Sequence, residues 1–134
     1  MELRHLRYFV VLAEELHFRR AAEKLSMSQP PLSQTIKQLE TEIGAPLFER
    51  GRKRHVKLTA AGRVFRESAE RILVASEKAK QSAYLTNKGE SGMLPIVHSD
   101  DEIADFLPAL LSRFSLRYPN VYPDFYTGIQ TGFP

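Results

Sequence analysis

Apolar residues recur near the start of the chain at spacings of three and four, the period of an amphipathic helix. The first stripe consists of Leu3, Leu6, Val10, Ala13 and Leu16. It predicts a helix over residues 3–16. A second apolar set, Ala21, Ala22 and Leu25, leaves room for only two helical turns before the polar turn at 26–28.

A third helix is predicted from Gln29 onward. Ser28 can act as its N-cap, and Pro30 and Pro31 suit the first turn, where a missing N–H is tolerated. The positions expected to be buried, again spaced by three and four, are Leu32, Ile36, Leu39 and Ile43. Gly44, with Pro46 soon after it, is expected to end the helix. The opposite face is polar and free of acids, and it carries Gln29, Ser33, Gln34 and Lys37.

A basic segment follows the third helix. Within eight positions it holds five cations and no acid, namely Arg50, Arg52, Lys53, Arg54 and Lys57. Because Val56 and Leu58 alternate with a polar residue, we predict a short β-hairpin with its tip at residues 51–55.

Residues 60–87 contain no proline and are rich in helix-forming residues, which predicts a long helix capped by Thr59. One face shows alternating spacings of four and three, typical of a coiled-coil-like seam. Its members are Phe65, Ala69, Ile72, Ser76, Ala79 and Ala83. The seam indicates a dimer; the alternative is that it packs on the core of its own domain.

The composition changes after the long helix. Residues 88–92 have the glycine and polar content of a hinge. Beyond them we predict a strand at 93–97, a helix at 102–118 and a strand at 121–126. Two strands make too little sheet to be stable alone.

The length of 134 residues allows one compact domain, or a small domain with an appendage. Residues 1–90 hold 17 Lys and Arg against 11 Asp and Glu, whereas residues 91–134 hold 2 against 5. The basic charge therefore belongs to the first two thirds of the chain, which favours a polyanionic partner there. The chain has no cysteine, so disulfides, thiolate nucleophiles and sulfur-bound metals are excluded.

The N-terminus is interrupted by charges such as Arg4, Arg7 and Glu14, so it is neither a signal peptide nor a membrane span. We expect no membrane association and a cytoplasmic protein.

Two short helices joined by a polar turn, followed by a basic hairpin, are typical of a winged helix-turn-helix. In such a fold the helix from Gln29 would enter the major groove of double-stranded DNA, and the hairpin would lie along the flanking backbone or minor groove. Five cations without an acid suit this role, because neutralising phosphates releases counterions.

Residues 3–50 and the LTAAG segment at 58–62 resemble the LysR-type transcriptional regulators, and the resemblance extends through the long helix. It implies a helix-turn-helix at about 18–37. The residues it places against DNA are Gln29, Pro30, Pro31, Ser33, Gln34 and Lys37, with the wing cations Arg50, Arg52, Lys53 and Arg54. The SQPPLS segment at 28–33 looks most like members that regulate aromatic-compound catabolism.

The expected fold class is mainly α, with an incomplete α/β segment at the end. The expected domains are a winged helix-turn-helix at 1–59, a linker and dimerisation helix at 60–88, a hinge at 89–92, and the truncated start of an α/β inducer-binding domain at 93–134. Because that last domain would be incomplete, we expect the small-molecule inducer site to be absent. A dimer, or a higher homo-oligomer through the linker helix, would bind an inverted-repeat operator.

Two other functional classes compete with a DNA-binding regulator. The main alternative is a protein-interaction module that keeps the winged helix as a scaffold and assembles through the long helix. A hydrolase using His98 and Asp100 is disfavoured, because neighbours in sequence do not make a converging catalytic site. His5 and His17, both assigned to the first helix, are too far apart to share a metal, and His55 lies among cations. We therefore expect no enzyme, no cofactor and no metal.

Overall fold

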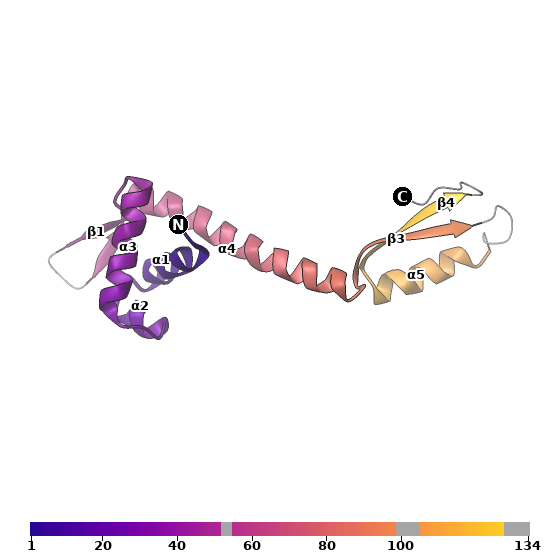
Figure 1. Cartoon of the computed structure of the whole chain (residues 1–134), viewed down its shortest axis with the longest axis horizontal. Coiled ribbons are helices and arrows are strands. Elements are labelled where there is room, and N and C mark those ends of the chain that lie inside the picture. The colour runs from indigo at the N-terminus through magenta and orange to yellow at the C-terminus, as the bar shows by residue number, and fades with distance from the viewer. Residues whose placement is uncertain (52–54, 99–104, 128–134) are drawn as a thin grey trace. The chain divides into compact units, whose positions relative to one another are not determined.

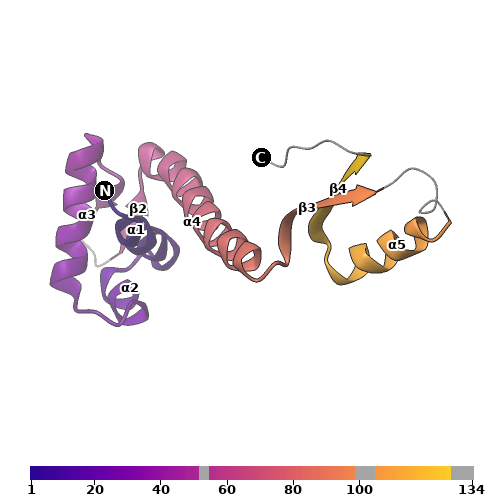
Figure 2. The same ribbon diagram turned by 45° about the vertical axis from the view of Figure 1, so that its right-hand side comes forward.

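The structure is a computed structural model that describes residues 1–51, 55–98 and 105–127. The chain forms two compact units, Met1–Glu77 and Lys78–Pro134, and the boundary between them falls within a long helix. The elements run in the order α1 (Leu3–Glu15), α2 (Phe18–Lys24), α3 (Gln29–Ile43), β1 (Phe48–Arg50), β2 (Val56–Leu58), α4 (Ala60–Asn87), β3 (Ser91–His98), α5 (Leu107–Arg117) and β4 (Asn120–Thr127). Figures 1 and 2 show this order from two directions.

The first three helices are confirmed, but the predicted buried stripe of α1 is wrong in part. The residues of α1 that are buried are Leu6, Phe9, Leu12 and Ala13, while Leu3 is 45% exposed. Every position from Tyr8 to Ala13 is apolar, so the sequence allows two offset stripes at helical spacing. Packing against α2 and α3 selects the one that carries Phe9, whose ring contacts Phe48 and Phe65.

Helix α3 begins at Gln29 as predicted, with Ser28 at the N-cap, but the Ser28 side chain makes no capping hydrogen bond. A cap of this kind bonds the backbone N–H of the second or third helical residue. Those residues are Pro30 and Pro31, which have no N–H. The expected capping bond is therefore absent for a chemical reason that the sequence already contains.

The other end of α3 follows the prediction more closely. Gly44 ends the helix in the left-handed conformation with φ of 77°. Leu32, Ile36 and Leu39 are buried. Ile43, expected to be buried with them, is 38% exposed, because the helix ends there and its last turn extends past the core.

The predicted hairpin is present as the antiparallel pair β1 and β2, which aligns Phe48 with Leu58 and Arg50 with Val56. It is extended by a bridge between His17 and His55. The backbone N–H of Val56 donates to the carbonyl of Leu16 at 3.1 Å. The wing is thus tied to the α1–α2 connection as well as to its own partner strand.

Helix α4 covers the predicted range and is capped as expected, because the Thr59 hydroxyl accepts the backbone N–H of Gly62 at 2.9 Å. At its C-terminal end, Gly89 has φ of 70° and its N–H donates to the carbonyl of Thr86. The N–H of Glu90 donates to the carbonyl of Leu85, which completes a Schellman motif. The expected hinge is shorter than predicted, since Ser91 and Gly92 already belong to β3.

The second unit contains a parallel pair of strands, β3 and β4, in which Met93 aligns with Tyr122 and Val97 with Tyr126. Both views place α5 along one side of this pair (Figures 1 and 2). The helix begins at Leu107 and not at residue 102, because Asp105 and Phe106 form a turn. Pro95 is accepted within β3 because both strands of a two-stranded sheet are edge strands.

The buried core of the described residues lies entirely in the first unit and joins α1, α2, α3, the wing and α4. None of the described residues of β3, α5 and β4 is buried, and Met93, Leu116 and Tyr122 are each more than 60% exposed. Among the described residues no helix is both long and apolar enough to cross a bilayer.

Candidate nucleic-acid interface

The solvent-facing side of α3 carries every residue that was predicted to face DNA from this helix. Gln29, Pro30, Pro31, Gln34 and Lys37 are exposed, and Ser33 is half-buried. The opposite side holds the helix in the core through Leu32, Ile36 and Leu39. The core therefore fixes which side of α3 is presented to solvent.

The charges around this face are not equally available to a ligand. In α2, Lys24 pairs with Glu14 and Glu15 at 3.1 Å each, and Arg19 pairs with Glu23 at 3.2 Å. Hydrogen bonds to the two α1 carboxylates raise the pKa of Lys24 above its ordinary value. The side chain of Lys37, in contrast, makes no ion pair with any described residue. Lys24 thus ties α2 to α1, and Arg19 pairs within α2, whereas no described acidic side chain neutralises the charge of Lys37.

The wing supplies a second basic element. Arg50 ends β1, and its guanidinium lies 3.4 Å from the carboxylate of Glu40 and 5.9 Å from the ring centroid of Phe18. Lys57 is exposed on β2. Arg52, Lys53 and Arg54, the other predicted wing cations, lie outside the described residues.

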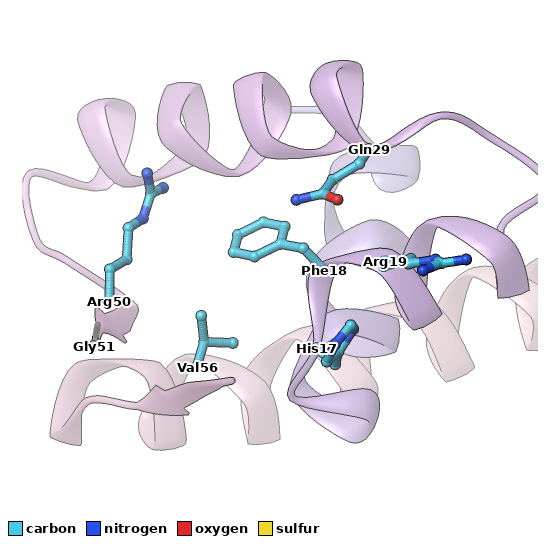
Figure 3. Close-up of a pocket in the computed structure, with 7 residues that line it drawn as sticks. All are labelled: His17, Phe18, Arg19, Gln29, Arg50, Gly51 and Val56. Carbon is cyan, nitrogen blue, oxygen red and sulfur yellow. The ribbon is translucent and has the colours of Figure 1, made fainter. Parts of the chain in front are cut away.

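An open hollow of about 480 Å³ lies between the start of α2, the start of α3 and the base of the wing. Its lining consists of His17, Phe18, Arg19, Gln29, Arg50, Gly51 and Val56. Figure 3 shows Phe18, Gln29 and Arg50 extending toward the same space, while the guanidinium of Arg19 extends away from it. Gln29, the first residue of α3, and the wing cation Arg50 thus line the same hollow, together with the ring of Phe18.

Two residues in this region, His17 and Glu40, have roles that the sequence analysis missed. His17 was assigned to the first helix, which is wrong: α1 ends at Glu15, and His17 is the N-cap of α2, accepting the backbone N–H of Arg20 at 3.3 Å. Its ring lies 5.3 Å from that of His55. Glu40 was not singled out at all, although its position, four residues after buried Ile36 and one after buried Leu39, places a carboxylate at the edge of an apolar stripe.

The predicted dimer seam divides into two parts. Ala69 is fully buried and Phe65 packs against the same core, so these two residues contact their own chain, as the alternative interpretation of the seam allowed. Ile72, Ala79 and Ala83 are exposed and Ser76 is half-buried. Only the second part of the seam is open to a partner.

The candidate enzyme and metal residues are not brought together among the described residues. His98 has its ring against Phe125, with the centroids 6.4 Å apart, and Asp100 lies outside the described residues. No group of three or more metal-ligating side chains occurs in the part of the chain that the structure describes.

Two helices joined by a tight turn, with the second presented to solvent beside a two-stranded wing, define a winged helix-turn-helix protein. The sequence model described as "Bacterial regulatory helix-turn-helix protein, lysR family" matches residues 3–63. The chain belongs to this family, as the resemblance in the sequence indicated.

Individual relatives agree with that assignment. The chain is 46% identical to the HTH-type transcriptional regulator AlsR of Bacillus subtilis over 90% of its own length and 40% of AlsR. It is 48% identical to the HTH-type transcriptional regulator BudR of Klebsiella aerogenes, over 87% of this chain and 82% of BudR. The chain therefore spans less than half the length of AlsR. Both relatives are named as transcriptional regulators, a class of proteins that are not enzymes.

The fold is also similar to that of a solved regulator. The structure of full-length CbnR complexed with its target DNA matches with a TM-score of 0.82 and 33% identity, covering 96% of this chain and 44% of CbnR. The predicted fold class, a mainly helical chain with a winged helix-turn-helix and a later α/β segment, is confirmed.

Proposed function

We propose that the chain is a sequence-specific DNA-binding transcriptional regulator. The observation that carries this proposal is the exposed, acid-free face of α3, held by the core beside the wing cation Arg50. A helix of this kind fits the major groove of B-form DNA, where base edges present hydrogen-bonding patterns. CbnR, whose fold is similar, was solved with its target DNA.

The residues of the α3 face divide into three groups in the proposal. Gln29, Ser33 and Gln34 offer amide and hydroxyl groups that can hydrogen-bond to base edges. Lys37 contributes a charge to a phosphate. Pro30 and Pro31 present apolar surface at the start of the helix.

The wing is proposed to add affinity and not sequence discrimination. Arg50, Arg52, Lys53 and Arg54 would follow the backbone or minor groove next to the α3 site. Each phosphate that such cations neutralise releases condensed counterions, so binding should weaken steeply as salt rises.

A dimer through α4 is part of the same proposal. Ile72, Ser76, Ala79 and Ala83 are the seam residues open to a second copy, and the small side chains among them permit two helices to approach closely. A two-fold dimer presents two copies of α3 and would therefore bind an inverted repeat, with half-sites about one or two helical turns apart. In this layout residues 1–59 bind DNA, 60–88 link and dimerise, and 93–134 begin an inducer-binding domain.

Two finer assignments also belong to the proposal. A DNA-binding regulator must reach the chromosome, which places the protein in the cytoplasm with the nucleoid. The SQPPLS segment at 28–33 supports a role in aromatic-compound catabolism. Mapping the sites that the protein binds across a genome would test this role. We expect genes for aromatic-ring metabolism beside the bound sites, and the absence of such genes would contradict the role.

The direct test of DNA binding is selection of duplexes from a random pool with the full chain at physiological salt. We expect enrichment of one inverted-repeat sequence. A pool that stays random after several rounds would contradict sequence-specific binding. The protein-interaction alternative is not favoured, because the relatives are transcriptional regulators and CbnR was solved bound to DNA.

A further inference from the structure

Glu40 connects α3 to the wing through its side chain. One carboxylate oxygen, Oε1, accepts the backbone N–H of Leu47 at 2.8 Å and that of Phe48 at 3.1 Å. The other oxygen, Oε2, lies 3.4 Å from Nη2 of Arg50. A single side chain on α3 thus holds both the start of β1 and the cation at its end.

Burial and further hydrogen bonds restrain this connection between α3 and the wing. Leu47 and Phe48 are buried on either side of the accepted N–H groups, and the Glu40 side chain is only 15% exposed. The backbone carbonyl of Glu40 also accepts the N–H groups of Gly44 and Ala45, at 2.9 and 3.2 Å. The turn between α3 and the wing is therefore closed by hydrogen bonds to one residue.

The contact with Glu40 holds Arg50 but does not engage all of its N–H donors. Its side chain is 44% exposed and lies in the hollow shared with Phe18 and Gln29 (Figure 3). A guanidinium has five N–H donors, and the contact with Glu40 engages one of its nitrogens. Arg50 therefore keeps donors for a phosphate oxygen while its position is set from α3.

We propose that Glu40 is a positioning residue for DNA binding: it fixes Arg50 relative to the α3 face, so that helix and wing contact one duplex at the same time. This inference rests on the proposed function. The physical reason is preorganisation, because a cation already ordered before binding loses less conformational freedom on binding. Lys37 lies three residues before Glu40 on the same helix, so both contacts share one rigid frame.

A purely structural role is the competing explanation, and Glu40→Gln separates the two. The amide oxygen of glutamine can still accept the N–H groups of Leu47 and Phe48, but the ion pair with Arg50 is lost. Glu40→Ala removes both interactions. We expect thermal unfolding of Glu40→Gln close to that of the parent chain, and a lower midpoint for Glu40→Ala.

The deciding measurement is a double-mutant cycle on DNA affinity, using the duplex selected by the parent chain. The chains are the parent, Glu40→Gln, Arg50→Met and the double variant. Glu49→Gln serves as a matched control, since it removes a nearby exposed carboxylate on β1. We expect Glu40→Gln to weaken binding several-fold, up to roughly tenfold, in the parent, as for the cost of ordering one long side chain on binding, and not to weaken it in the Arg50→Met chain.

Other results would overturn the inference. Removing a negative charge near DNA should by itself strengthen binding, as we expect of Glu49→Gln. If Glu40→Gln strengthens binding in the parent chain, or weakens it equally in the parent and Arg50→Met chains, Glu40 does not act through Arg50.

Should Glu40→Gln fail to fold, Arg50→Lys tests the same link from the wing, because lysine keeps the charge but lacks the planar fork. Arg50→Lys must then lose most of the affinity lost in Arg50→Met, and binding at the parent's level contradicts the inference. A parent chain that selects no duplex defeats the proposed function itself, an outcome distinct from all of these.

Discussion

The backbone carbonyl oxygen of Leu47 occupies the space in which a Cβ on Gly62 would stand. The same oxygen accepts the N–H of Thr59 at 3.0 Å, and the Thr59 hydroxyl donates to the carbonyl of Pro46 at 2.7 Å. The segment that enters the wing and the first turn of α4 are therefore in direct backbone contact. This junction adds to the contacts that hold the wing at Leu16 and Glu40.

Gly62→Ala should destabilise the first unit, since backbone must move to admit the methyl group. Overpacking of this kind costs about 1–3 kcal/mol, which for a chain of this size lowers the melting temperature by several degrees. Gly51→Ala is the control, because nothing lies within 4 Å of a Cβ there. Equal melting temperatures for the two variants in calorimetry would show that the junction relaxes freely.

Ser33 and Gln34 are expected to read bases. Replacing both with alanine should lower affinity for the selected duplex more than affinity for random DNA, because base contacts specify while phosphate contacts only position. Each lost base contact should reduce discrimination by roughly 1–3 kcal/mol. Competition binding with both duplexes checks this, and an equal loss on both would refute the assignment.

The wing cations should govern the salt dependence. Changing Arg52, Lys53 and Arg54 to glutamine should make the slope of log affinity against log salt shallower by about 0.9 for each phosphate contact removed. Arg113→Gln on α5 is the control and should leave the slope unchanged. If the triple variant keeps the parent's slope, these three residues do not contact phosphates.

The open part of the seam should mediate dimerisation. Ala79→Arg together with Ala83→Arg places two bulky cations where close approach is needed, so sedimentation at micromolar concentration should show monomers. Gln81→Arg, about half a turn away on the same helix, should remain dimeric. If the parent chain is monomeric at these concentrations, the seam does not associate by itself.

The N-terminal ammonium pairs with Glu42 at 2.8 Å and thereby links the start of α1 to the last turn of α3. This hydrogen bond and the charge of the ammonium lower the pKa of Glu42 below its ordinary value of 4.5. The stabilisation is therefore present above pH 4.5 and is lost as pH falls through the lowered pKa. An NMR titration should show the Glu42 pKa moving back toward 4.5 when the N-terminus is acetylated. No movement would mean that the pair does not form in solution.

Local signals predicted the helices and their ends well. Gly44 and Thr59 act where they were expected, because a left-handed C-cap and a hydroxyl N-cap depend on residues within one turn. The exposed face of α3 was also predictable, since the acid-free positions lie opposite a stripe of three buried residues. These features need no knowledge of the rest of the chain.

Most features that were predicted wrongly depend on tertiary contacts; the missing Ser28 capping bond is the exception, because Pro30 and Pro31 alone account for it. The sequence could not show which stripe of α1 is buried, because every position from Tyr8 to Ala13 is apolar. Packing in the folded chain buries the stripe that contains Phe9. The pairing of His17 with His55 joins residues 38 positions apart, so no local pattern indicates it. Glu40 looks like an ordinary helix carboxylate until β1 folds back and brings Leu47, Phe48 and Arg50 to it.

The most direct test of the central claim is a fluorescence anisotropy titration of the full chain. It would compare the selected inverted-repeat duplex with a scrambled duplex of the same composition at physiological salt. Sequence-specific regulators bind their sites about 10³-fold or more tightly than other DNA. We predict a ratio of at least that order, and equal affinity for the two duplexes would contradict the proposed function.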